Sequence, residues 1–205
     1  MKKCIILLLL LCLINCSKEK HVLIPSGATV VVLGDSLSYG TGANKSEDYP
    51  SLLAQRTGWN IINAGVPGET SAQGLERLPI LLDQYHPALL ILELGGNDLL
   101  QHLPNHQTEN NLKIAIAQAR AKQAQVVLIA IPEVNALRAA VGALKDHPLF
   151  DKVAQETKTP LIKKVFAEVL SESELKADYV HPNAQGYANV SEKMYENLAE
   201  LGFLP

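Results

Sequence analysis

The residues best suited to chemistry are a serine, an aspartate and a histidine that lie far apart in the chain. Ser36 is the candidate nucleophile, His181 the base that takes its proton, and Asp178 the carboxylate that holds the imidazole in the right tautomer. The backbone N–H groups of Ser36 and Gly68, with the side-chain amide of Asn97, would face the oxyanion of a tetrahedral intermediate. This set predicts acyl transfer, in which the serine attacks an ester carbonyl.

The predicted secondary structure brings these residues to one edge of a sheet. Three apolar runs, at residues 30–33, 59–64 and 88–94, read as strands, and each is followed by a loop that contains glycine. Those loops carry the serine, the glycine and the asparagine. Because ligands gather at the carboxyl ends of parallel strands, we expect these residues to share one rim. The aspartate and the histidine are three residues apart and precede a predicted final helix over 184–201.

Strands alternate with helices along the whole chain, which predicts a three-layer α/β/α domain with a parallel sheet. Further strands are expected at 125–131 and 160–162, but the pattern does not fix the strand order. The remaining helices are expected at 49–57, 71–85, from Thr108 onward, 150–158 and within 163–177. Within the segment 133–148, the pattern leaves open whether 137–144 is helical and covers the site.

Four sequence blocks resemble those of the SGNH hydrolase superfamily, also called the GDSL esterases and lipases. They occur in the family's order at residues 34–38 (Gly-Asp-Ser-Leu-Ser), 63–70, 95–98 (Gly-Gly-Asn-Asp) and 178–182. The chain is most similar to the bacterial thioesterase I/protease I/lysophospholipase L1 group, also known as arylesterases. That closer likeness rests on residues 74–79 and 93–98.

The resemblance implies a flavodoxin-like sheet of five parallel strands and a serine hydrolase that cleaves carboxylic esters or thioesters through an acyl-enzyme on Ser36. An arylesterase, an acyl-thioesterase and a lysophospholipase all fit, and neither a metal nor another cofactor is implied. By the family pattern Gly68 and Asn97 complete the oxyanion hole, and Asp178 and His181 complete the triad. Gly65 lies in the same block as Gly68 and is an alternative donor. The family's substrate-binding loop is only loosely matched by Pro132, Glu133, Val134 and Asn135, so the preferred acyl chain stays open.

Other interpretations remain. Ser36 could serve only as a helix cap, and His147 beside Asp146 is a rival base. A glycine-rich loop after the first strand could also cradle phosphate or a flavin in a non-catalytic, flavodoxin-like binding module. Within the enzymes, a carbohydrate O-acetylesterase is the close competitor.

Composition excludes several other classes. The 205 residues suffice for one domain, and 47% hydrophobic with 19% charged residues is typical of a globular protein. Residues 21–205 hold 14 basic and 20 acidic residues, a net charge of −6, which argues against a nucleic-acid partner. All three cysteines, Cys4, Cys12 and Cys16, lie near the N-terminus. The body therefore has no disulfide, thiolate nucleophile or cysteine metal site.

The N-terminus reads as an export signal. Two lysines precede an apolar run over 5–14, which is too short to span a bilayer. The run ends near Cys16, in a sequence that resembles a lipoprotein lipobox, although Asn15 departs from the usual small residue. An ordinary export signal is the alternative. We expect a signal peptide at 1–16, a polar tether at 17–27 and a hydrolase domain at 28–205. The protein would then be a lipoprotein of the periplasm or outer membrane, or otherwise periplasmic or secreted, with a small ester, thioester or lipid as its substrate.

Overall fold

A five-stranded parallel sheet forms the centre of the protein. The computed structural model describes residues 21–133, 135, 137–138 and 141–204. The strand order is β2-β1-β3-β4-β5, which confirms the predicted flavodoxin-like sheet. The strands are β1 Thr29–Gly34, β2 Asn60–Gly65, β3 Leu89–Glu93, β4 Gln125–Ile129 and β5 Leu161–Ile162.

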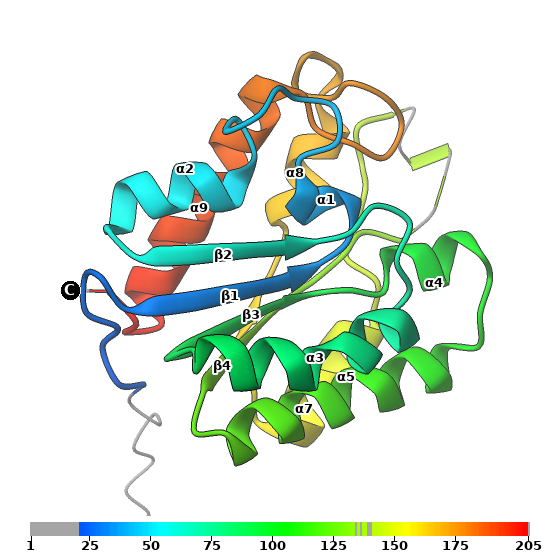
Figure 1. Ribbon diagram of the computed structural model, residues 1–205. Helices are drawn as coiled ribbons and strands as arrows, with labels where there is room; N and C mark the ends of the chain where they lie inside the picture. Colours follow the sequence, from blue (N-terminus) through cyan, green and yellow to red (C-terminus); the bar gives the residue numbers. More distant parts are fainter. Residues whose placement is uncertain (1–20, 134, 136, 139–140, 205) are drawn as a thin grey trace, which may run out of the picture.

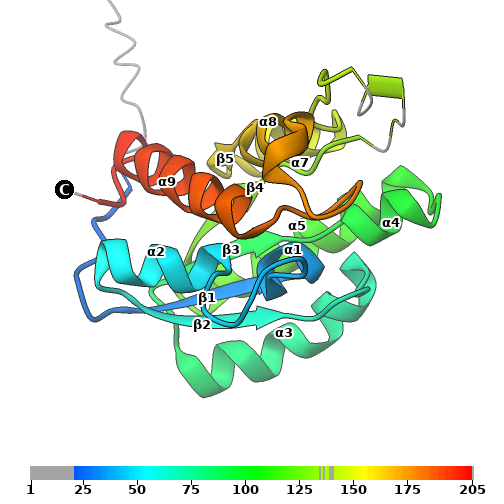
Figure 2. The same cartoon turned by 90° about the horizontal axis from the view of Figure 1, so that it is seen from above.

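Helices cover both faces of this sheet, as Figures 1 and 2 show. One face is covered by α2 (Tyr49–Thr57), α8 (Val165–Ser171) and α9 (Ala184–Glu200), and the other by α3 (Ser71–Tyr85), α5 (Asn105–Ala121) and α7 (Leu149–Thr157). Because both faces are covered, β1 and β3 consist almost entirely of buried apolar side chains. The predicted three layers are thus present.

The strand register sets the starting points of the loops that carry the candidate residues. At its carboxyl end, Gly34 of β1 lies opposite Gly65 of β2 and Glu93 of β3. The chain leaves the sheet from these three neighbouring positions toward Ser36, toward Gly68 and toward Asn97. Parallel pairing therefore brings the first three candidate residues to one rim.

Local capping explains where several helices begin. The Asp48 side chain accepts from Ser51 N at 2.8 Å and starts α2 over the predicted residues 49–57. Thr70 and Gln73 form a capping box at the start of α3. The predicted start of the next long helix at Thr108 is wrong, because α5 begins at Asn105. Its first turn is polar and lacks the apolar period on which the prediction relied.

Two short helices were not expected from the sequence, and the segment 137–144 is described only in part. The short helices are α1 (Ser36–Tyr39) and α4 (Gly96–Leu100), and both lie at the carboxyl edge of the sheet. For the open segment 137–144, residues 134, 136, 139 and 140 lie outside the described part, 137–138 are helical, and 141–142 form a turn. Near the end of the chain, a 3-10 turn at Ser173–Leu175 follows α8.

The first described residues pack at the opposite edge of the sheet from the candidate site. The backbone of Val22 exchanges two hydrogen bonds with the side chain of Gln125, the first residue of β4. Ile24 is buried, and its N–H donates to the Phe203 carbonyl at 2.9 Å. The proposed signal peptide lies outside the described residues, and the boundary at residue 28 stays a prediction. Across the described ranges, no helix has the length and apolar character needed to cross a membrane.

Candidate active site

Ser36 begins α1 directly after β1, but it does not cap this helix. The cap is Asp35, whose carboxylate accepts from Leu37 N at 3.0 Å. Gly40 ends the helix after a single turn, in the left-handed conformation. The hydroxyl of Ser36 is therefore not needed for capping and is available for another partner.

That partner is His181, and the histidine in turn contacts Asp178. Ser36 Oγ lies 3.0 Å from His181 Nε2, and His181 Nδ1 lies 2.8 Å from Asp178 Oδ2. With its Nδ1–H donating to the carboxylate, the imidazole has Nε2 free to accept the serine proton. The structure thus brings together the three residues that the sequence singled out, across 145 positions of the chain.

The carboxylate of Asp178 accepts hydrogen bonds from backbone N–H groups of its own turn. Its Oδ1 accepts from Val180 N at 2.8 Å and from His181 N at 2.9 Å. Partial burial raises the pKa of Asp178, but the hydrogen bond from the His181 ring and those backbone bonds outweigh this effect and lower the pKa overall. The carboxylate is therefore ionised at neutral pH and can stabilise an imidazolium.

The turn that carries the histidine, together with the helix that follows it, packs against the segment directly after α1. Ala177 N donates to the His181 carbonyl at 2.9 Å, which closes the turn on itself. Tyr187, in the first turns of α9, donates its hydroxyl to the Thr41 carbonyl at 2.8 Å, and Thr41 follows α1. Gly42 packs so closely that a Cβ there would lie 2.4 Å from the Pro182 carbonyl oxygen. These contacts fix the distance between the serine and the histidine.

Ser36 and Gly68, the two candidate backbone donors, both line the cavity beside the site. Among the residues that the structure describes, neither Ser36 N nor Gly68 N has an acceptor. Gly68 is exposed and has φ +81°, a backbone conformation that residues other than glycine rarely adopt. The alternative donor is different, because Gly65 N donates to Asn63 Oδ1 at 3.0 Å.

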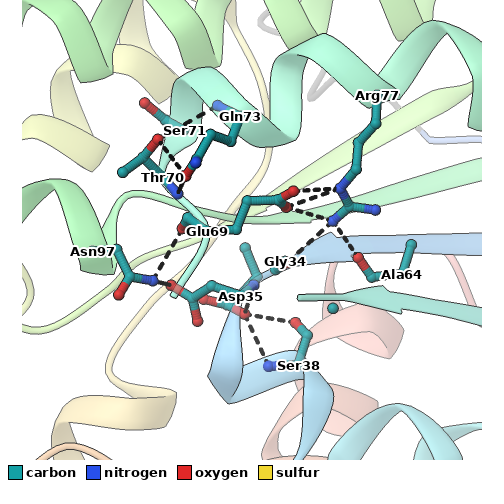
Figure 3. A network of polar contacts seen from close by, with 12 residues as sticks. Gly34, Asp35, Ser38, Ala64, Glu69, Thr70, Ser71, Gln73, Arg77 and Asn97 are labelled. Atoms are coloured by element: carbon teal, nitrogen blue, oxygen red, sulfur yellow. Dashed lines mark hydrogen bonds and ion pairs between the residues drawn. The ribbon is translucent and has the colours of Figure 1, made fainter. Parts of the chain in front are cut away.

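Asn97 lies on α4, beside the serine, but its amide already has partners. The Nδ2 group donates to Asp35 Oδ2 and to the Glu69 carbonyl, both at 3.0 Å (Figure 3). An oxyanion that binds to this amide must therefore share or displace one of these two acceptors. Sequence reasoning placed Asn97 at the rim but did not foresee these contacts.

Two carboxyl groups close to Ser36 in the fold, those of Asp35 and Glu93, are buried. Burial raises the pKa of Asp35 to about 6. Glu93, at the end of β3, is fully buried, and burial together with Asp35 raises its pKa well above the ordinary range. Glu93 Oε2 accepts from Ser38 Oγ at 2.6 Å, from Ser38 N at 3.1 Å and from Asp35 N at 3.3 Å. A glutamate in an otherwise apolar strand is the signal from which this contact could have been predicted.

A cavity of about 400 Å³ opens beside Ser36, within the size range of small-molecule sites. Its walls are mainly apolar, with Leu37, Leu100, Ile131, Leu144 and Leu170 among the lining residues. The expected substrate loop contributes three of its four residues: Pro132, Glu133 and Asn135 line the cavity, and Val134 lies outside the described residues.

His147 and Asp146, the alternative base and its neighbouring carboxylate, do not hydrogen-bond to each other. His147 Nδ1 accepts from Leu149 N at 3.2 Å, and Asp146 Oδ2 accepts from Lys164 N at 2.7 Å, so the two side chains serve separate turns. Over residues 21–204, apart from the four that are not described, no three histidine, cysteine, aspartate or glutamate side chains group as a metal site would require.

Comparison with known proteins decides the family. A sequence profile described as the GDSL-like Lipase/Acylhydrolase family matches residues 32–188, which include every residue of the candidate site. The chain belongs to this family. This hydrolase is 34% identical over 181 residues to thioesterase 1/protease 1/lysophospholipase L1 of Escherichia coli K12, with 84% of each chain covered. It is 32% identical over 188 residues to esterase TesA of Pseudomonas aeruginosa, covering 84% of this chain and 89% of the relative.

Solved structures agree with the family. The psychrotrophic esterase EstA from Pseudoalteromonas sp., in a structure inhibited by monoethylphosphonate, matches with a TM-score of 0.72 and 28% identity. That match covers 84% of this chain and 97% of EstA. The protein is therefore an SGNH-type carboxylic ester hydrolase, as the sequence predicted.

Proposed function

We propose that this hydrolase cleaves esters or thioesters of apolar acyl groups through an acyl-enzyme on Ser36. The observation that carries the proposal is the continuous line of contacts from Ser36 Oγ to His181 Nε2 and from His181 Nδ1 to Asp178, at 3.0 and 2.8 Å. Both distances lie within reach for proton transfer and for orientation of the base.

In the first half-reaction the Ser36 oxygen attacks the carbonyl carbon while its proton passes to His181 Nε2. The tetrahedral intermediate collapses when the imidazolium returns this proton to the leaving alcohol or thiol, and the acyl group stays on the serine. In the second half-reaction His181 takes a proton from water, and the hydroxide attacks the acyl carbon. The carboxylic acid then leaves as Ser36 regains its proton, while Asp178 stabilises the imidazolium in both halves.

The oxyanion donors are the N–H groups of Ser36 and Gly68 and the amide of Asn97. Within the described part of the chain Gly68 N has no acceptor, whereas Gly65 N donates to Asn63 Oδ1, which favours Gly68 as the donor from this loop. Donors fixed before the reaction act without reorganisation as the oxyanion develops, which is why they lower the barrier. Asn97 differs from the two backbone donors, because its amide must share or release one of its present acceptors before it donates to the oxyanion.

The apolar walls of the cavity support an acyl chain, rather than a sugar ring, as the group bound beside the serine. The names of the relatives, thioesterase, lysophospholipase and esterase, support the same class. A panel of p-nitrophenyl acetate, octanoate and palmitate, with a lysophospholipid, measures the preference. We expect kcat/KM to be higher for octanoate than for acetate. A preference for acetate, extended to acetylated sugars, would favour the carbohydrate O-acetylesterase instead.

The nucleophile has a direct test. Ser36→Ala should lower kcat by about 10⁶ and leave the fold intact, because Asp35 rather than the serine caps α1. A phosphonate ester should add one phosphonyl group to the native protein, detected by mass spectrometry, and none to the variant. Unchanged turnover in the variant would disprove the proposal.

We also propose that the protein is exported and attached to a membrane through a lipid on Cys16. The apolar run at 5–14 and the lipobox-like sequence around the cysteine support this. Val22, near that end of the described residues, packs at the edge of the sheet away from the site. The site would then face away from the attachment point. Mass spectrometry of protein from the membrane fraction tests the anchor: an N-terminal diacylglyceryl cysteine supports it, and an unmodified Cys16 refutes it.

A further inference from the structure

Arg77, on α3, forms a partly buried ion pair with Glu69, the residue that follows Gly68. Arg77 Nε donates to both carboxylate oxygens of Glu69, at 2.7 and 2.9 Å, and Nη2 donates to Oε2 at 2.6 Å. The side chain of Glu69 is 8% exposed and that of Arg77 is 25% exposed. A guanidinium that grips a carboxylate at this depth fixes its orientation as well as its position.

The same guanidinium also contacts the ends of the two strands that lead into the site. Arg77 Nη2 donates to the Ala64 carbonyl of β2 at 2.5 Å and reaches the Gly34 carbonyl of β1 at 3.4 Å (Figure 3). Gly34 precedes Ser36 by two positions, and Ala64 precedes Gly68 by four. One side chain therefore joins the strand that delivers the nucleophile to the strand and loop that deliver the glycine.

Glu69 extends this connection to the third donor. While its side chain is held by Arg77, its backbone carbonyl accepts from Asn97 Nδ2 at 3.0 Å, and the same amide donates to Asp35. Gly68 itself has no atom within 4 Å of the place where a Cβ would stand, so little else packs against it on that side. Glu69 thus adjoins Gly68 in the chain and accepts a hydrogen bond from the Asn97 amide, so a shift of Glu69 would move both donors.

We propose that Arg77 and Glu69 are a positioning pair for the oxyanion donors. The inference rests on the proposed function, since it requires Ser36 as the nucleophile and Gly68 and Asn97 as donors. The pair does not touch the substrate. It acts through the loop between β2 and α3. Breaking the ion pair misaligns the donors, whose hydrogen bonds to the oxyanion are strongest in the transition state.

The main test compares Arg77→Gln with Arg77→Lys on a p-nitrophenyl ester. Displacing donors by about 1 Å costs up to ~100-fold in rate, so we expect kcat of Arg77→Gln to fall by about 10- to 100-fold with KM within about twofold. Lysine keeps the charge but not the forked geometry and should give an intermediate kcat. A trifluoromethyl ketone, which forms an oxyanion on Ser36, should lose affinity in proportion to kcat/KM.

Arg120 provides a matched control. It donates to the carbonyls of Thr157 and Lys158 and to the hydroxyl of Thr159, on the far side of the protein from Ser36. Arg120→Gln removes a comparable set of bonds and should leave kcat and the inhibitor affinity unchanged. Adding ethylguanidinium to Arg77→Ala should restore part of kcat, a recovery that general destabilisation would not produce.

A second variant keeps the proposal testable if Arg77→Gln does not fold. If Arg77→Gln is unfolded, Glu69→Gln keeps the guanidinium and its contacts with the strand ends, and it should show the same fall in kcat at unchanged KM. Unchanged kcat in folded Arg77→Gln or Glu69→Gln, while Ser36→Ala is inactive, would overturn the positioning pair alone. Full activity of Ser36→Ala would instead overturn the proposed function.

Discussion

Replacing Asp35 by asparagine should change how the stability of the protein depends on pH. Burial raises the pKa of this carboxyl from 3.8 to about 6, so the folded state binds the proton more tightly than the unfolded state does. The contribution of Asp35 to stability is therefore greatest below the unfolded pKa of 3.8 and falls as pH rises through the folded pKa of about 6. The folded and unfolded pKa values differ by about two pH units, which corresponds to about 3 kcal/mol in the free energy of unfolding. This contribution is lost in full above about pH 7.

The variant removes this titration while keeping the helix cap. Asparagine retains an oxygen that can accept from Leu37 N, and it is as good an N-cap residue as aspartate. Urea unfolding of both proteins between pH 4 and pH 8 measures the effect. The free energy of unfolding of the variant, relative to the native protein, should rise by about 2 to 3 kcal/mol over this range. With a typical urea slope, the difference between the two midpoints changes by about 1 M.

An exposed aspartate serves as the control. The hydrogen bond and charge of Lys122 lower the pKa of Asp83, so Asp83→Asn should give a weak dependence of the opposite sign. A stability difference between Asp35→Asn and the native protein that stays flat from pH 4 to pH 8 would show that the carboxyl titrates normally. The reasoning from its burial would then be refuted.

Two further substitutions test the site. Asn97→Ala should lower kcat by ~10²–10³ if the amide is an oxyanion donor, and a loss of less than threefold in steady-state kinetics would exclude that role. Asp178→Asn should lower kcat by ~10⁴, because the imidazole loses the acceptor that fixes its tautomer. Near-native kcat with normal circular dichroism would show that His181 is oriented by other contacts.

Much of the fold could be predicted because its signals are local. The apolar run at 30–33 lies within β1. Pro50, in the first turn of the predicted helix 49–57, and Gly58, directly after it, indicate both ends of α2. By contrast, α1 and α4 have four and five residues, too few for an apolar period to repeat. The strand order depends on pairing between distant segments, so the periodicity of single segments could not reveal it.

The candidate site divides in the same way. Ser36 and His181 could be named from their blocks, and parallel strands alone bring three loops to one rim. The partners of Asn97 could not be named, because Asp35 and the Glu69 carbonyl reach it from two other loops. Likewise Arg77 meets Glu69 only after the chain has turned from β2 into α3. Contacts of this kind exist only once the tertiary structure has formed.

Because Asp35 caps α1, capping of the helix and contact with His181 are divided between two residues, although a single serine could have done both. Since the helix is capped by the aspartate, the hydroxyl of Ser36 is left to contact His181, as its proposed role as the nucleophile requires. Position 36 is therefore a point where the reaction can be altered without altering the scaffold. We expect that selection or an engineer can exchange the proposed nucleophile, for example for cysteine, while α1 keeps its cap and position 36 stays beside His181.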